Sequence, residues 1–195
     1  GSGFYLEPMW PAGLTEGAMV ESIVRDITEG ADGTGIRSGI IGEIGTERFG
    51  PERPMSDGYY MALRAAARAQ QATGAPINIH PGHSPDSPME IVRYLDKHGA
   101  DVRRVAISHI DRTVFMHEMR VGLAKTGCYL VYDMFSFEGW HLTRHVLSEE
   151  NPIHVEVPND AGRVAEIVQL VEAGFIEQIL ISHDHCSKHR LFSWG

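Results

Sequence analysis

The sequence predicts an α/β fold built on a parallel sheet. Five short runs rich in isoleucine and valine recur along the chain with helix-length segments between them: residues 39–45, 76–80, 105–109, 128–133 and 179–184. Their apolar residues are continuous and not alternating, which is typical of strands buried on both faces. A shorter run at 3–6 is typical of the end of one more strand. Strands that alternate with helices in this way form a doubly wound sheet or a barrel.

The segments between the runs carry helix signals. Five helices are expected: four over residues 15–29, 58–73, 87–99 and 114–126, and a last one around residues 164–171 that Gly174 closes. Thr15 is the expected N-cap of the first, and Ser87 begins the third, with Glu90 placed to complete a capping box. The last helix carries aliphatic residues at helical spacing, an apolar stripe of Val164, Ile167, Val168 and Val171. The glycine-rich segment 30–35 precedes a strand, so it indicates a turn and not a dinucleotide-binding loop.

Composition excludes several classes of partner. The 195 residues carry a formal net charge of −9, which disfavours binding to nucleic acid or anionic membranes. No apolar run approaches the ~20 residues that cross a bilayer, and no signal-peptide pattern is present. The two cysteines do not form a disulfide framework, which favours a reducing compartment. We therefore expect a cytoplasmic protein that acts on a small molecule.

Polar residues that can bind metals stand at or near the ends of four predicted strands: Glu43, His80, His109 and Asp184. Any one of them alone is more often a helix cap or a loop residue. The carboxyl ends of parallel strands meet at one edge, however, so the recurrence predicts that these side chains converge. Two imidazoles and two carboxylates suit Zn²⁺, Mn²⁺ or a similar ion.

The segment from 134 to 159 is too long for a plain connection. Its aromatic and basic residues predict a loop that covers the substrate, the alternative being a surface excursion with its own small core. Together with two residues near the ends of predicted strands, it supplies the candidate substrate-binding residues, which are Tyr5, Asp133, Phe135, Trp140 and Arg144.

Several motifs occur in one order along the whole chain: residues 35–45, 65–69 with 73–74, 79–80, 108–111, 127–133 and 181–191. In this order they resemble the phosphotriesterase family of the amidohydrolase superfamily, and its phosphotriesterase-related branch in particular. The resemblance implies a (β/α)₈ TIM barrel with two divalent metal ions, usually Zn²⁺, bridged by a hydroxide. It is compatible with a homodimer.

The same resemblance assigns roles to the candidate residues. His80 and His109 hold one ion, Asp184 holds the other, and Glu43 bridges both, where the best-known members carry a carboxylated lysine. Asp184 is the implied catalytic residue, which passes a proton to the leaving group. The implied reaction is hydrolysis of a carboxylic ester, a lactone or an amide, with a phosphotriester less favoured because of Glu43.

The chain departs from the family pattern in one respect. The family's first strand carries a His-x-His pair that completes the second metal site, and no such strand is found in this sequence. We therefore expect residues 1–195 to form one incomplete barrel domain, covering about strands 3 to 8 and lacking the first strands and the last helix. The ion shared by Glu43 and Asp184 is expected to bind weakly.

Two other functions remain open on the sequence. A TatD-like metal-dependent nuclease also shows a Gly-Glu-Ile-Gly strand, here residues 42–45, followed by His, His and Asp. Its eighth strand normally reads Glu-Thr-Asp, where this chain has Ser-His-Asp at 182–184. The other alternative is a ligand-binding barrel without catalytic activity, which the missing His-x-His pair makes a serious possibility.

Overall fold

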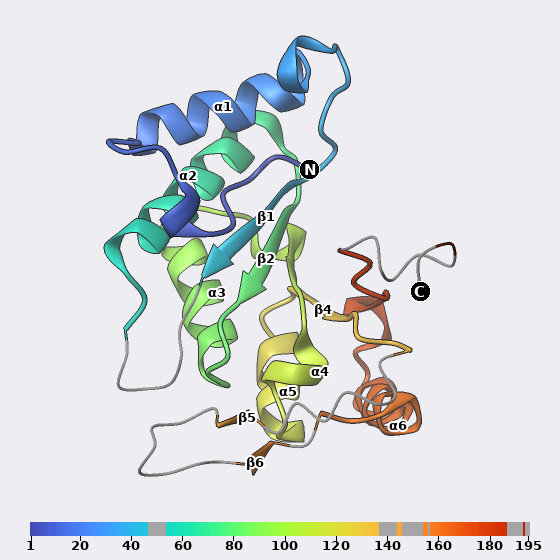
Figure 1. The fold of residues 1–195 in the computed structure, drawn as a ribbon. Helices are drawn as coiled ribbons and strands as arrows, with labels where there is room; N and C mark the ends of the chain where they lie inside the picture. Colours follow the sequence, from blue (N-terminus) through green and yellow to red (C-terminus); the bar gives the residue numbers. More distant parts are fainter. Residues whose placement is uncertain (47–53, 137–143, 146–153, 156, 187–192, 194–195) are drawn as a thin grey trace.

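A computed structural model describes residues 1–46, 54–136, 144–145, 154–155, 157–186 and 193. Five parallel strands form one sheet in the order β1-β2-β3-β4-β7 (Figure 1). They are β1 (Ile41–Thr46), β2 (Ile77–Pro81), β3 (Val105–Ile107), β4 (Tyr129–Tyr132) and β7 (Ile179–Ile181). Each strand lies beside the next one of the sheet in chain order. This is the order of a barrel, because a doubly wound sheet reverses direction at a switch point.

The N-terminal segment extends this sheet beside β1. Ser2 forms a parallel bridge with Ile41, and the amide of Gly45 donates to the carbonyl of Phe4 at 3.0 Å. A Cβ atom at position 45 would lie 1.7 Å from the carbonyl oxygen of Tyr5, so only glycine allows the two backbones to approach this closely. Residues 3–6 do not form the predicted strand in the described structure; the segment pairs with β1 only through the bridge at Ser2 and the hydrogen bond to Phe4.

Six α-helices accompany the strands in the described part of the chain: α1 (Glu16–Thr28), α2 (Asp57–Thr73), α3 (Ser87–Lys97), α4 (Ile110–Thr113), α5 (His117–Ala124) and α6 (Asp160–Glu172). Short 3-10 turns lie at Glu7–Met9, Ala31–Gly33, Val102–Arg104 and Ile176–Gln178. The sequence predicts five of the helices to within a few residues and misses α4. A two-stranded antiparallel pair, β5 (Arg144–His145) with β6 (His154–Val155), lies within the long segment 134–159.

One predicted N-cap is confirmed and one is wrong. The hydroxyl of Thr15 accepts a hydrogen bond from the amide of Ala18 at 3.2 Å, as expected for the cap of α1. Ser87 does not cap α3, since the helix already includes it and Asp86 occupies the cap position with no side-chain bond. The carboxylate of Glu90 accepts a hydrogen bond from the Tyr60 hydroxyl at 2.5 Å, so Glu90 is engaged on α2 and does not form the predicted capping box.

The core lies between the sheet and the helices that pack on it. The face of α2 toward the sheet is made largely of small residues, all fully buried: Ala62, Ala65, Ala66, Ala67 and Ala69. Small side chains allow a helix to pack close to its neighbour at the density typical of protein interiors. The isoleucines of the central strands complete this layer, with no exposed surface at Ile77, Ile79 and Ile107.

The packing of α6 differs from the prediction. The helix forms where its apolar stripe predicts it, but the buried residues are Arg163 and Leu170. Three stripe residues are largely exposed, with 50% of the surface of Val164, 46% of Val168 and 40% of Val171 accessible. The fourth residue of the stripe, Ile167, is partly buried against the core, so the stripe faces the core only in part.

The structure bears on two features of the composition, the apolar content of the helices and the state of the two cysteines. None of the helices in the described ranges is long and apolar enough to cross a membrane. Both cysteines are free thiols, Cys128 buried directly before β4 and Cys186 exposed after β7. Burial raises the pKa of the Cys128 thiol to about 11.

Candidate metal centre

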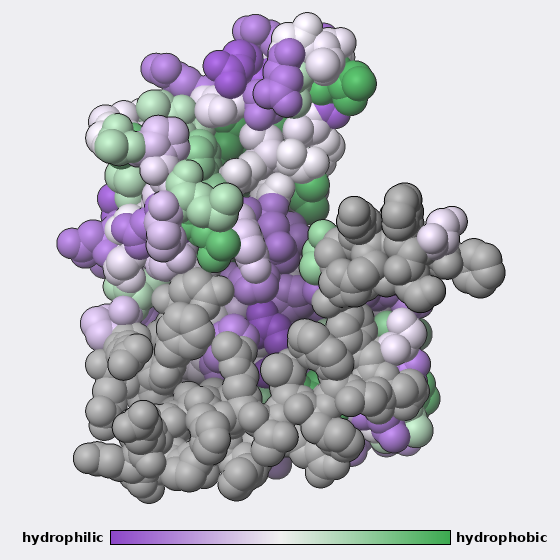
Figure 2. Space-filling model, in the orientation of Figure 1, coloured by the Kyte–Doolittle hydropathy of each residue, from purple (hydrophilic) through white to green (hydrophobic). Residues whose placement is uncertain are grey.

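Three potential metal ligands converge where neighbouring strands of the sheet end. Glu43 lies in β1, His80 in β2, and His109 two residues after β3. The Nε2 atom of His109 lies 2.8 Å from Nδ1 of His80, and Oε1 of Glu43 lies 3.5 Å from each of these nitrogens. Within the described residues, these three form the group whose ligand atoms all lie within 4.8 Å of one another. In the space-filling view, hydrophilic residues gather in the middle of this face of the molecule (Figure 2).

The backbone at His109 turns sharply to bring the ring into the cluster. Strand β3 ends at Ile107, and His109 adopts φ +58°, ψ +36° immediately before α4. A left-handed conformation is uncommon for a residue other than glycine, and such residues concentrate at functional sites. The amide of His109 donates to both carboxylate oxygens of Asp133, at 3.1 Å each, which holds the turn in place.

Asp133 also orients the ring of His109. Its Oδ1 atom lies 2.7 Å from Nδ1 of the ring, and both side chains are buried. A carboxylate on one ring nitrogen fixes the tautomer and leaves the other nitrogen as the ligand, an arrangement typical of histidines that bind metals. Asp133 is predicted from the sequence to bind the substrate. In the structure its carboxylate is engaged by His109.

His80 has outer partners of a different kind. Its Nε2 atom lies 3.3 Å from the hydroxyl of Tyr5 and 3.1 Å from Nη2 of Arg112. The Tyr5 and His80 rings meet edge to face, with their centroids 4.7 Å apart. These contacts leave Nδ1 of His80 directed at His109 and Glu43. Tyr5 is among the predicted site residues and Arg112 is not, because nothing in the sequence around residues 108–113 singles out this arginine.

The cluster is electrostatically coupled. Burial raises the pKa of Glu43, but hydrogen bonds from His109 and His80 outweigh it and lower that pKa to about 2. Burial lowers the pKa of His109, yet the carboxylates of Asp133 and Glu43 raise it to about 9. Burial, together with the nearby charges of His109 and Arg112, lowers the pKa of His80. Without a metal the Glu43 carboxylate is therefore balanced by a proton on His109.

The donor set fits a divalent metal ion. One carboxylate oxygen and two imidazole nitrogens are the ligands that Zn²⁺ and similar ions accept. When the other nitrogen binds a metal, the remaining N–H of each ring lies beside a group that can accept its proton, the carboxylate of Asp133 for His109 and the hydroxyl of Tyr5 for His80. A bound cation would take the place of the proton on His109, because imidazole binds metals only in its neutral form.

The other predicted site residues are more scattered. Asp184 follows β7 at φ +45°, is partly exposed, and does not belong to the three-residue cluster. Phe135 packs partly buried against the core, with its ring 5.9 Å from the guanidinium of Arg163. Trp140 lies outside the described residues, and for Arg144 only the backbone in β5 is described.

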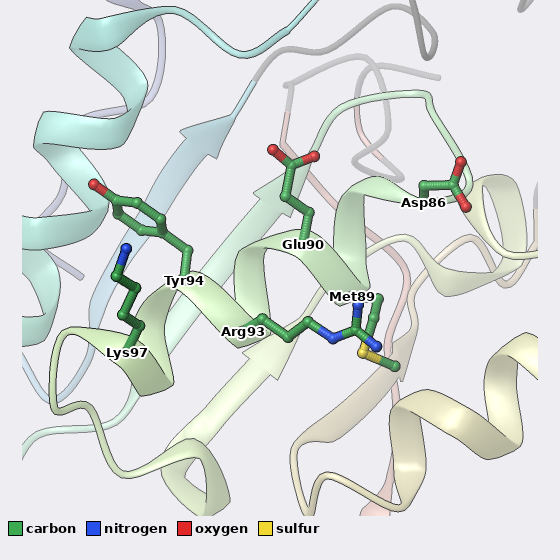
Figure 3. A pocket seen from close by; sticks show the side chains of 6 residues that line it. All are labelled: Asp86, Met89, Glu90, Arg93, Tyr94 and Lys97. Carbon is green, nitrogen blue, oxygen red and sulfur yellow. The ribbon is translucent and has the colours of Figure 1, made fainter.

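A separate hollow lies on the outer side of α3. It has a volume of about 490 Å³ and is lined by Asp86, Met89, Glu90, Arg93, Tyr94 and Lys97 (Figure 3). All six residues belong to α3 or directly precede it. None of them belongs to the metal cluster, so we treat the two features separately.

The sequence model of the phosphotriesterase family matches residues 1–195. The N-acetyltaurine hydrolase of Mus musculus is 36% identical over 198 residues, covering 100% of this chain and 53% of that protein. Among solved structures, a resiniferatoxin-binding protein from Rhodobacter sphaeroides has a TM-score of 0.82 at 29% identity, over 99% of this chain and 51% of the other. A mutant of a PTE-like lactonase from Deinococcus radiodurans has a TM-score of 0.69 at 27% identity, over 87% of this chain and 46% of the other. The chain thus spans about half the length of the curated relatives it matches.

Proposed function

The chain belongs to the phosphotriesterase family, and on this premise we propose that it forms part of a metal-dependent hydrolase. The observation that carries the proposal is the convergence of Glu43, His80 and His109. The outer nitrogen of each histidine ring also has a partner, Asp133 for His109 and the Tyr5 hydroxyl for His80. The match to the family over the whole chain leaves the TatD-like nuclease without support.

Each residue of the site has a distinct part in the proposed reaction. His80, His109 and Glu43 would hold a first ion, and Asp184 would contribute to a second in a complete site. When bound, such ions polarise the substrate oxygen and make a water molecule acidic enough to attack near neutral pH. Asp184 takes a proton from the attacking water and hands it to the leaving group.

For the substrate we propose an N-acyl amide, with a carboxylic ester or lactone as close alternatives. The names of two relatives support an amide or a lactone, since the mouse protein at 36% identity is an N-acetyltaurine hydrolase and a Deinococcus radiodurans protein at 27% is a PTE-like lactonase. Other Deinococcus radiodurans structures at 27% identity carry the name organophosphorus hydrolase. The glutamate at position 43, in place of a carboxylated lysine, argues against a phosphotriester. Binding of a ligand without turnover is the second candidate function, because one structural neighbour is a resiniferatoxin-binding protein.

A substrate panel tests the proposed function. The purified chain, with Zn²⁺ or Mn²⁺ added, is offered N-acetyltaurine, a γ-lactone, an aryl ester and a phosphotriester, and product is followed by mass spectrometry. We expect metal-dependent hydrolysis of the amide or the lactone, abolished by a chelator. Metal binding without turnover of any substrate would contradict the proposal for this chain and favour the ligand-binding alternative. Turnover of the phosphotriester above all others would contradict the substrate assignment.

Exchanging Asp184 for asparagine is expected to lower kcat by about 10²-fold to 10⁴-fold, the usual contribution of a general acid–base residue. Asparagine has a similar shape but cannot carry the proton. The measurement is steady-state kinetics on the best substrate of the panel. Zinc bound at Glu43, His80 and His109 should remain, because Asp184 does not belong to that cluster. An unchanged kcat would exclude the proton-transfer role.

A further inference from the structure

A buried ion pair joins α4 to α6. The Nε atom of Arg163 lies 2.9 Å from Oδ2 of Asp111, and neither side chain has exposed surface. Nη1 of the same arginine lies 2.7 Å from Oδ1 of Asp160 at the start of α6. Charges are rarely buried this completely unless they are paired and hydrogen-bonded.

Both carboxylates that pair with Arg163 also accept hydrogen bonds from backbone amides of the segment just after β4. Oδ2 of Asp111 accepts a hydrogen bond from the amide of Met134 at 3.0 Å. The carboxylate of Asp160 accepts one from the amide of Ser136, at 3.0 and 3.1 Å from its two oxygens. Arg163 therefore fixes two backbone amides of this turn through two intermediate side chains.

The same turn begins with the residue that orients His109. Strand β4 ends at Tyr132, whose carbonyl accepts a hydrogen bond from the amide of Ser182 at 2.9 Å. Asp133 is the next residue. Its position therefore depends on the hydrogen bonds that Asp111 and Asp160 accept from the amides of Met134 and Ser136. Its carboxylate in turn accepts hydrogen bonds from the backbone amide of His109 and lies 2.7 Å from the ring Nδ1.

We propose that Arg163 is a positioning residue for the metal centre, acting through Asp111 and the turn after β4 on Asp133 and so on His109. The inference rests on the proposed function in that it takes His109 to be a metal ligand. It goes beyond that function by assigning a role to a residue of α6 that has no contact with the cluster.

A matched control separates this role from general stabilisation. Arg120 is also a buried arginine facing α6, 3.2 Å from Glu166, and its Nη1 donates to the carbonyls of Val114 and Phe115. None of these contacts reaches the backbone of the turn after β4; Glu166 does interact with the side-chain hydroxyl of Tyr132, but the backbone of Tyr132 is held in β4 by its pairing with Ile181. Loss of Arg120 should loosen the packing of α5 on α6 but leave Asp133 in place.

The test compares Arg163→Met, Arg163→Lys and Arg120→Met in the full chain. Zn²⁺ affinity is measured by competition with a chromogenic chelator, and solvent exchange of the His109 Nδ1 proton by NMR on histidine-labelled protein. Arg163→Met should weaken Zn²⁺ binding about 10-fold, the lower end for loss of an outer partner, and speed the exchange of the proton by a similar factor. Arg163→Lys should weaken Zn²⁺ binding by a smaller factor, about threefold, since one ammonium can still bond Asp111 but cannot hold Asp160 as well. Arg120→Met should change neither quantity.

Equal effects of Arg120→Met and Arg163→Met, or no effect of a folded Arg163→Met, would overturn the proposal. If Arg163→Met does not fold, Arg163→Lys is compared with Arg120→Met. Equal Zn²⁺ affinities and equal exchange rates of the His109 proton in these two variants would overturn the proposal. If the unaltered chain binds no Zn²⁺, the proposed function fails, while the positioning role is still decided by the exchange rate of the His109 proton.

Discussion

Replacing His109 by alanine is expected to weaken Zn²⁺ binding about 100-fold. Structural zinc sites with four ligands bind with roughly 10–16 kcal/mol, so one ligand contributes about 3 kcal/mol, equivalent to about two orders of magnitude in affinity. His109 is one of three described ligands and the one with the most rigid support, through Asp133. Competition with a chromogenic chelator at pH 7.5 measures the change. His98→Ala is the control, since that ring stacks on Tyr94 of α3, outside the cluster.

The double variant His80→Ala, His109→Ala should lose the ion altogether. Metal content per chain, measured by mass spectrometry after dialysis, is expected to fall from about one to near zero. A double variant that keeps its zinc would place the ion elsewhere, for example near Asp184 and the residues after it. A ratio near two in the unaltered chain would mean that the second ion finds its ligands in spite of the absent His-x-His pair.

The strands were the most predictable part of the fold. The runs expected at 39–45 and 76–80 are β1 (Ile41–Thr46) and β2 (Ile77–Pro81), within two residues at each end. Continuous runs of isoleucine and valine have few alternatives to a buried strand once glycine, proline or polar residues bound them. The strand at 105–109 was predicted too long, because His109 leaves the strand in a left-handed conformation that the sequence does not signal.

Convergence of metal ligands could be predicted from topology alone. Glu43, His80 and His109 come together because the ends of parallel strands share one edge of the sheet. The outer partners could not be predicted in this way. Asp133 could contact a substrate or a histidine from the same position, and only the conformation of the turn after β4 decides between them. Arg112 reaches His80 from the short helix α4, which no periodic pattern indicates.

The packing of α6 shows a different limit of sequence analysis. An apolar stripe indicates a face that favours burial, but it does not say which part of the molecule covers it. In the described structure the stripe residues Val164 and Val168 are largely exposed, whereas Arg163 beside them has no exposed surface. A buried arginine is rare, and only the three-dimensional position of Asp111, 52 residues away in sequence, accounts for it.

This burial leads to a large expected loss of stability when the arginine is removed. Arg163→Met should lower the free energy of unfolding by about 3–5 kcal/mol, because the carboxylate of Asp111 would remain buried without its partner. The measurement is urea denaturation followed by circular dichroism, with the m-value expected to stay constant while the midpoint falls.

Arg103→Met is the control, since its ion pair with Asp101 is of similar length, 3.0 Å, but 80% of the Arg103 side chain is exposed. Water already solvates that pair, so its loss should leave the midpoint unchanged. Equal shifts in the two variants would show that burial is not the source of the effect, and would remove the physical basis for treating Arg163 as a fixed anchor of the turn that holds Asp133.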